Sequence, residues 1–163
     1  MRESRVNVTL IAALKYLLLI VFVAFLLSQA RGAKASLSPF EDVQSAVLSA
    51  ADLTPMTEGD NQMIRRIYGL DPDSFEGILL YYPTSSMSVE EILLVKLTDV
   101  SQGDSIRQVM EDRIQSQIDV FAGYGPEQVA MLEKAIVEVR GNYALLVVAD
   151  QPDAVRQAFL AAL

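Results

Sequence analysis

The chain has 163 residues, and its 21 acidic and 13 basic side chains give a net charge of −8 at pH 7. It contains neither cysteine nor histidine. These absences exclude disulfides, a lipid-modified cysteine, thiol nucleophiles, a Ser-His-Asp triad and histidine-ligated metal sites. We therefore expect no catalytic residues, no metal and no cofactor, and we predict that the protein is not an enzyme.

The charge is distributed unevenly along the chain. The first 35 residues contain five basic side chains and one acidic one, which leaves eight basic against twenty acidic side chains in the remainder. Because phosphate binding requires clustered Lys and Arg, the acidic body argues against nucleic acid as a partner. Anionic lipid headgroups would also repel it. The basic N-terminal segment is the part suited to a membrane.

Residues 8–27 form an apolar run of twenty residues with one charge, Lys15. A helix of this length is about 30 Å long, which matches the hydrocarbon core of a bilayer. One interpretation is a retained signal anchor that spans the membrane once, with the C-terminal domain outside. The other is a cleavable signal peptide, cut after Ala30 or Ala35 where small residues precede the bond, which releases a secreted protein. Both interpretations place the domain outside the cytoplasm.

The remaining chain predicts a short linker and one domain. We assign residues 1–30 to the signal anchor or signal peptide, 31–37 to the linker and 38–163 to a single extracytoplasmic α+β domain. Ser38 is expected to cap the first helix, with Glu41 completing a capping box. A turn over residues 52–58 and a second helix over 60–68, closed by Gly69, should follow.

Four strands are expected after these two helices. The pattern predicts strands at 77–82, 91–97, 135–140 and 143–149, the last two joined by Gly141-Asn142, a hairpin signal. Helices are expected at 102–121, at 126–134 and from 151 onward. The order is helix, helix and then two strand–strand–helix units, which predicts a mainly antiparallel four-stranded sheet packed with helices. Since several strands are apolar at consecutive positions, both sheet faces need cover. We expect the two N-terminal helices to supply the second layer, or else a partner or a second copy.

No residue qualifies as catalytic, but four are candidates for ligand or partner contact. Arg140, Asn142 and Tyr143 belong to the predicted hairpin, where a guanidinium could bind a carboxylate or phosphate. A salt bridge from Arg140 to Glu138 or Glu76 is the alternative. Tyr82 is the fourth candidate, as part of an aromatic surface.

Several short stretches resemble a known family. They are Ile-Tyr-Gly-Leu at 67–70, Glu-Gly-Ile-Leu-Leu-Tyr-Tyr-Pro at 76–83, Glu-Ile-Leu-Leu-Val-Lys at 91–96, Gly-Tyr-Gly-Pro-Glu-Gln at 123–128 and Val-Arg-Gly-Asn-Tyr at 139–143. From Asn61 onward the chain resembles a small, uncharacterised family of Gram-positive bacterial envelope proteins. Its members pair a lipoprotein signal or membrane anchor with one domain of unknown function. The resemblance implies an extracytoplasmic bacterial protein, and without the lipoprotein cysteine this chain would be anchored by its helix.

The sequence therefore predicts a membrane-tethered extracytoplasmic module that binds an envelope protein or a cell-wall component. One alternative is a structural domain that self-associates into a homo-oligomer through an exposed sheet face. The other is a cell-envelope hydrolase that works with carboxylates alone.

Overall fold

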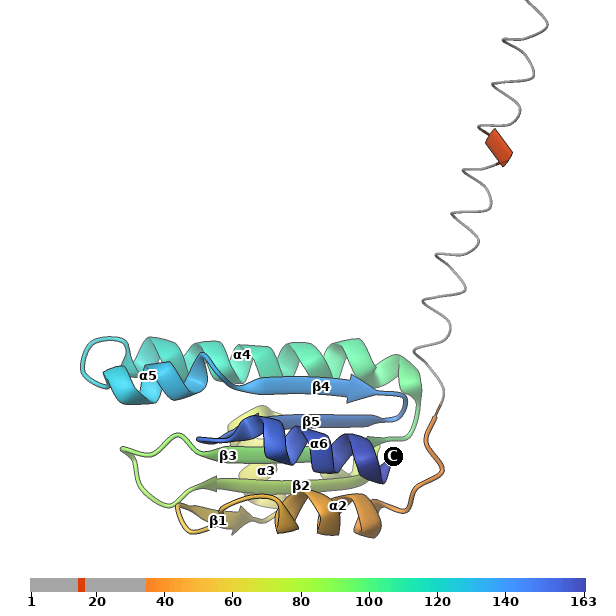
Figure 1. Ribbon diagram of the computed structural model, residues 1–163, viewed down its shortest axis with the longest axis horizontal. Helices are drawn as coiled ribbons and strands as arrows, with labels where there is room; N and C mark the ends of the chain where they lie inside the picture. Colours follow the sequence, from red (N-terminus) through yellow and green to blue (C-terminus); the bar gives the residue numbers. More distant parts are fainter. Residues whose placement is uncertain (1–14, 17–34) are drawn as a thin grey trace, which may run out of the picture. The chain divides into compact units, whose positions relative to one another are not determined.

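The computed structural model describes residues 15–16 and 35–163, and Ala35–Leu163 form one compact unit (Figure 1). The predicted signal or transmembrane segment lies outside the described residues, apart from Lys15 and Tyr16. Within the described part, no helix is both long enough and apolar enough to cross a membrane.

Five antiparallel strands form one sheet in the order β1-β2-β3-β5-β4. Their bounds are Met56–Gly59 (β1), Phe75–Pro83 (β2), Glu91–Leu97 (β3), Ile136–Arg140 (β4) and Tyr143–Val148 (β5). The expectation of four strands is wrong, because β1 occupies the predicted turn and pairs Thr57 with Tyr82 of β2. With four residues and one buried apolar side chain, Met56, β1 is too short to show a strand period in the sequence.

Five helices and two 3₁₀ turns accompany the sheet in the compact unit. They are α2 (Phe40–Ser49), α3 (Asn61–Tyr68), η1 (Pro72–Ser74), η2 (Val100–Gln102), α4 (Gly103–Phe121), α5 (Pro126–Leu132) and α6 (Pro152–Ala162). Helix α3 has the ends that the sequence predicts: the Asp60 carboxylate accepts a hydrogen bond from the Met63 N–H, and Gly69 follows with φ 66°. A left-handed residue at this position favours glycine.

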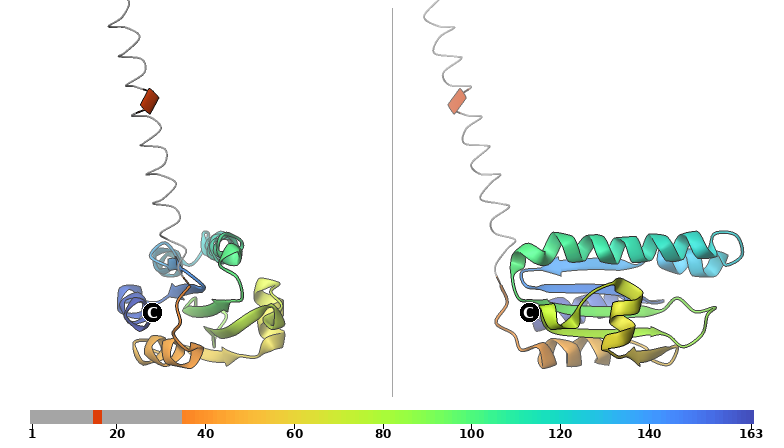
Figure 2. Two further views of the ribbon diagram at one scale, coloured as in Figure 1. Left: turned by 90° about the vertical axis from the view of Figure 1, so that its right-hand side faces the viewer. Right: turned by 180° about the vertical axis from the view of Figure 1, so that it is seen from behind.

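The sheet lies between two layers of helices (Figure 2), and an apolar core fills the space on each of its faces. One face, called here the α3/α4 face, is covered by α3, α4 and α5, and the opposite α2/α6 face is covered by α2 and α6. Successive residues of β3 alternate between them, so Leu93 packs in the first core and Leu94 in the second. The prediction that both sheet faces are covered is confirmed. The two N-terminal helices do not form one layer, however, because α2 and α3 lie on opposite faces.

The predicted capping box at the start of α2 is also wrong. Pro39 precedes the helix, and no side chain caps it. The Ser38 hydroxyl instead donates to the main-chain oxygen of Leu163 at 3.3 Å. A tertiary contact across the domain has replaced the local one that the sequence favours.

The two strand–strand–helix units are confirmed in order, as β2-β3-α4 and β4-β5-α6. They are not repeats in space. Their inner strands, β3 and β5, pair antiparallel, but α4 and α6 cover opposite faces of the sheet.

Candidate functional site

A buried polar cluster of Tyr68, Glu91 and Arg113 lies on the α3/α4 face of the sheet. Glu91 begins β3 and is 2% exposed, one of the few polar side chains buried among the described residues. Arg113 of α4 donates to it from Nη2 at 2.7 Å and from Nε at 3.2 Å. Tyr68, the last residue of α3, donates its hydroxyl to the same carboxylate. The cluster therefore ties two helices to the central part of the sheet.

The electrostatics of the cluster favour a charged pair and a neutral phenol. Burial raises the pKa of Tyr68 well above its ordinary value, and the charge of Glu91 adds to this. Burial works against the charge on Arg113, but the hydrogen bonds and charge of Glu91 outweigh it and raise the pKa of the guanidinium. Both oxygens of Glu91 thus accept hydrogen bonds from donors that keep their protons. A carboxylate held in this way is poorly placed to act as a general base.

A shallow cleft of about 250 Å³ opens beside the cluster. Its walls come from α3 and α4 and consist of Ile67, Tyr68, Val109, Asp112, Arg113 and Ser116. The Arg113 side chain is 20% exposed, so one side of its guanidinium reaches solvent here. The sequence could have indicated this cluster, because Glu91 opens a strand that is otherwise apolar and Arg113 follows Met110 on the apolar face of its helix.

The predicted hairpin residues Asn142 and Tyr143 hold the chain's own N-terminal strap, which is defined here as residues 35–39. Asn142 Oδ1 accepts a hydrogen bond from the Ser36 N–H at 2.7 Å. The Tyr143 hydroxyl donates to the main-chain oxygen of Ser38 at 2.8 Å. Neither side chain is exposed. Their contacts in the structure are therefore intramolecular, and a ligand contact at either of them stays a prediction.

Arg140 forms the salt bridge that the sequence offered as the alternative. Its Nε lies 2.7 Å from Glu138 Oε1. The Nε of Arg156 in α6 lies 2.7 Å from the other carboxylate oxygen, Glu138 Oε2. The Arg140 side chain is nevertheless 56% exposed. Among the three hairpin candidates it is the one that solvent and a partner can reach.

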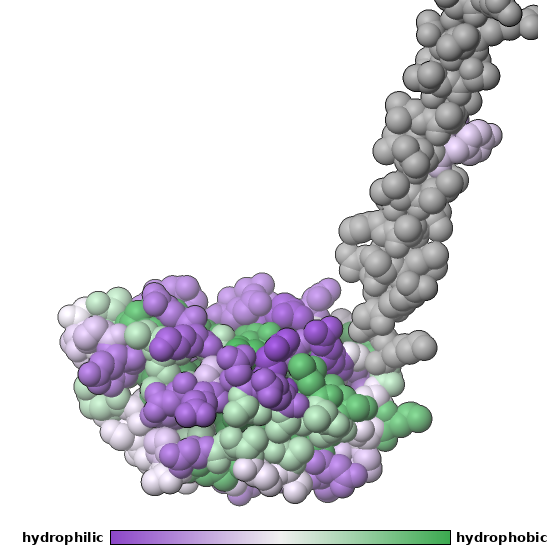
Figure 3. Space-filling model, viewed as in Figure 1, coloured by the Kyte–Doolittle hydropathy of each residue, from purple (hydrophilic) through white to green (hydrophobic). Residues whose placement is uncertain are grey.

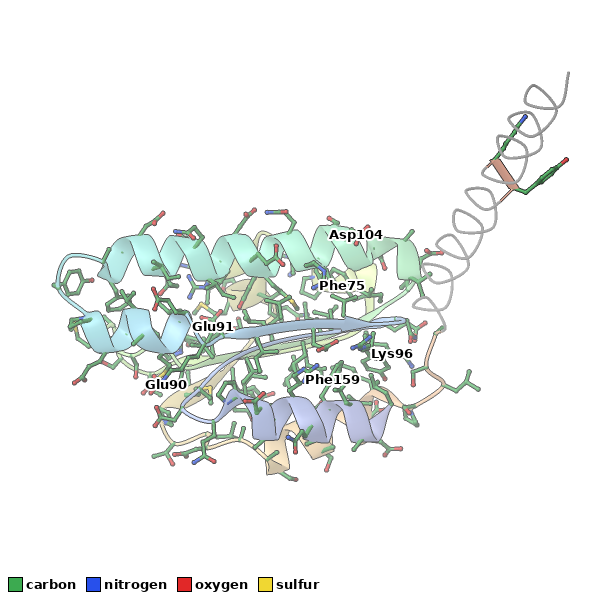
Figure 4. The ribbon with its side chains drawn as sticks, turned by 45° about the horizontal axis from the view of Figure 1, so that its top comes forward. Phe75, Glu90, Glu91, Lys96, Asp104 and Phe159 are labelled. Carbon is green, nitrogen blue, oxygen red and sulfur yellow. The ribbon has the colours of Figure 1, made fainter. Side chains whose placement is uncertain are left out.

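The fourth candidate, Tyr82, lies far from the other three. It sits near the end of β2 and faces the α3/α4 side, whereas Tyr143 faces the α2/α6 side at the opposite end of the sheet. Figure 4 shows the same separation along β3, where Glu91 and Lys96 mark the two ends. The structure brings Arg140, Asn142 and Tyr143 together and does not bring Tyr82 to them.

A second cleft, of about 340 Å³, carries three carboxylates. Asp52, Glu90 and Asp150 line it together with the two alanines that follow α2 and with Ala154 of α6. The hydroxyl and the backbone N–H of Thr54 lower the pKa of the exposed Asp52. Glu90, which precedes β3, lines this cleft, whereas Glu91 points to Arg113 on the α3/α4 face, so the two do not form a catalytic pair. No group of His, Cys, Asp or Glu that could hold a metal ion occurs within the described residues.

Three large apolar side chains are exposed at the end of the domain opposite the strap. Val120 and Tyr124 lie at the α4–α5 turn and are 53% and 58% exposed, and Met87 in the β2–β3 loop is 53% exposed. The β2–β3 loop contacts α5 at this end, since Gln128 of α5 donates to the main-chain oxygen of Met87 at 3.0 Å. We call these three residues the distal patch. The sequence analysis does not identify it, because helix and loop patterns do not show that α5 packs against the β2–β3 loop.

A family model described as "Domain of unknown function (DUF4358)" matches residues 49–149, which is more than half of the chain. The match covers all five strands and the Tyr68–Glu91–Arg113 cluster, and it leaves out the strap and α6. The resemblance to an uncharacterised domain family is thereby confirmed, whereas its Gram-positive envelope setting stays a prediction. No curated protein and no solved structure matches the chain.

Proposed function

We propose that this chain, which belongs to the DUF4358 family of domains of unknown function, is a membrane-tethered binding module of the bacterial cell envelope. Its N-terminal segment holds it at the outer side of the membrane. Its distal patch contacts an envelope protein or a cell-wall component. In this proposal the domain has no catalytic activity of its own.

The observation that carries the proposal is the position of the distal patch. Met87, Val120 and Tyr124 are more than half exposed although the sheet has apolar cores on both of its faces. One edge of Tyr124 packs on Phe121, and the rest of its side chain faces solvent. Methionine and aromatic side chains are enriched at protein interfaces. The patch also lies at the end away from the strap, through which the chain continues to its N-terminal segment. A tethered binding module would present its contact surface at that end.

One feature weighs against self-association, and another limits where a hydrolase could act. A self-associating domain was expected to use an exposed sheet face, but helices cover both faces of the sheet. A carboxylate-dependent hydrolase would need a free carboxylate pair. Glu91 is engaged by Arg113 and Tyr68, which leaves the cleft of Asp52, Glu90 and Asp150 as the place for such chemistry.

Site-specific photocrosslinking in intact cells tests the proposal. A benzoylphenylalanine replaces Tyr124, and a matched control replaces Glu111, which is exposed on α4 away from the distal patch. We expect a discrete adduct from position 124 and none from position 111. The adduct should be lost in a Met87→Ser, Val120→Ser background whose thermal unfolding is unchanged.

Two outcomes would contradict the proposal. Equal adduct patterns from positions 124 and 111 would remove the distal patch as a contact surface. A mature N-terminus at Arg31 or Ser36, found by sequencing the protein from cells, would remove the tether.

A further inference from the structure

The strap is fixed to the domain by hydrogen bonds on both sides of Leu37. Before it, the Ser36 N–H donates to Asn142 Oδ1 at 2.7 Å, and the Ser36 hydroxyl donates to Leu163 O at 3.0 Å. After it, Ser38 O accepts from the Tyr143 hydroxyl at 2.8 Å. The Ser38 N–H also donates back to the Ser36 hydroxyl at 3.2 Å. Residues 36–38 are therefore an ordered part of the domain surface.

This ordering forces the Leu37 side chain outward. Leu37 is 97% exposed, the highest value among the large apolar side chains of the described residues. A leucine in a free linker can turn toward any apolar surface nearby and reduce its contact with water. Here the bonds of Ser36 and Ser38 prevent that movement. The backbone around Leu37 is already ordered in the folded domain. A contact made through Leu37 therefore costs little additional conformational entropy.

The same end of the domain shows other features of a surface that meets lipid. Val100 in η2 is also exposed. It lies at this end because η2 directly follows the end of β3, where the Leu97 N–H donates to Asn142 O. Figure 3 shows apolar surface at this end, where the compact unit begins. Leu37 also follows the end of the apolar run at Leu27 by ten residues. Those residues could span at most about 36 Å when fully extended, so Leu37 must stay near any membrane that holds the run.

We propose that Leu37 inserts into the interfacial region of the membrane that holds residues 8–27, so that the strap seats the domain directly on the bilayer. This inference rests on the proposed tether. The contact is hydrophobic and not electrostatic. Glu41 and Asp99 are exposed near this end, the exposed Arg140 of the hairpin is already paired with Glu138, and the domain as a whole is acidic. Insertion should therefore occur on neutral phosphatidylcholine and should withstand high salt.

A lipid-quenching experiment on the full chain tests this contact. Since the protein has no cysteine, Leu37→Cys gives a single site for an environment-sensitive fluorophore. Met87→Cys is the matched control, because it is also exposed and lies at the opposite end of the domain. Both variants are reconstituted into phosphatidylcholine vesicles that carry spin-labelled lipid. Thermal unfolding confirms that the label leaves the fold intact.

We expect several-fold stronger quenching at position 37 than at position 87, unchanged in high salt. Equal quenching at the two positions in a chain that co-sediments with the vesicles would overturn the insertion of Leu37 and leave the tether standing. Failure of the full chain to co-sediment would overturn both. Quenching at position 37 that disappears in salt would also contradict the inference, because it would indicate an electrostatic contact.

Discussion

Arg113 shows how strongly one side chain can depend on another in this domain. It pairs with Glu91, whose carboxylate is almost completely buried and is therefore not solvated by water. Removing one partner of such a pair leaves an uncompensated charge in the interior. The pair is therefore expected to matter far more than the exposed ion pair of Arg65 with Asp71.

We predict that Arg113→Met destabilises the domain by about 3–5 kcal/mol, measured as the free energy of unfolding in urea. Arg107→Met, on the same helix, is the control and should change stability by less than about 0.5 kcal/mol. The triple variant Tyr68→Phe, Glu91→Leu, Arg113→Met should recover most of the loss, because it leaves neither a buried charge nor a buried hydroxyl without its acceptor. A triple variant as unstable as the sum of its single variants would refute the coupling.

Tyr68 should make the stability of the fold fall at alkaline pH. The pKa of its phenol is raised in the folded state, so the folded protein keeps this proton at a pH where the unfolded chain releases it. The stabilisation is fully present below the ordinary tyrosine pKa of about 10 and is lost as the pH rises above that value. We expect Tyr68→Phe to flatten the decline in the free energy of unfolding above about pH 10. Tyr124→Phe, at an exposed site, should leave the decline unchanged.

Among the elements, α2 depends on a close approach between Phe40 and Gly77. A β-carbon at position 77 would lie 2.6 Å from the Phe40 ring, which is too near for any side chain. The glycine stands beside a β-bulge between Phe75 and Gly77, where the register with β3 shifts. Because Phe40 is the first residue of α2, this contact helps to fix where the helix meets the sheet.

We predict that Gly77→Ala destabilises the domain by about 1–3 kcal/mol through overpacking against Phe40. Thermal unfolding measures the loss. Adding Phe40→Leu should restore part of the stability, because the shorter side chain leaves room for the methyl group. If the second substitution made the protein still less stable, the overpacking explanation would be wrong.

At the scale of the whole molecule, the domain has a complete set of layers. Side chains of β3 and β5 are buried on both faces of the sheet, and each face has its own helices. Nothing in this arrangement requires a second copy to cover an apolar sheet face. The two exposed ends, with Leu37 and Val100 at one and the distal patch at the other, are where external contacts are expected.

We therefore predict that residues 35–163, which contain both apolar cores, are monomeric in solution. Light scattering coupled to size-exclusion chromatography gives the molar mass directly. A monomer over a wide concentration range would remove the self-associating structural domain as an alternative function. A stable dimer would contradict the prediction and would direct attention to the distal patch, which a Tyr124→Ser variant would then test.

The sequence by itself determined the features that depend on neighbours along the chain. Spacing placed β3 at its observed bounds, and Gly69 marked the end of α3. The consecutive apolar residues of β3 and β5 indicated a sheet covered on both faces, because only buried strands tolerate such a pattern. The absence of cysteine and histidine excluded disulfides, thiol nucleophiles and histidine-ligated metal sites, because composition alone decides which side-chain chemistry a chain can supply.

Only the tertiary structure decided the features that join distant parts of the chain. The four residues of β1 form a strand because β2 offers them a hydrogen-bonding edge. Helices α2 and α3 lie on opposite faces of the sheet because the chain passes from one face to the other through β1 at the edge. The Ser38 hydroxyl donates to Leu163 and does not cap α2, and Glu91 of β3 pairs with Arg113 of α4. These contacts join residues far apart in the sequence, and no local preference encodes a partner that only folding brings near.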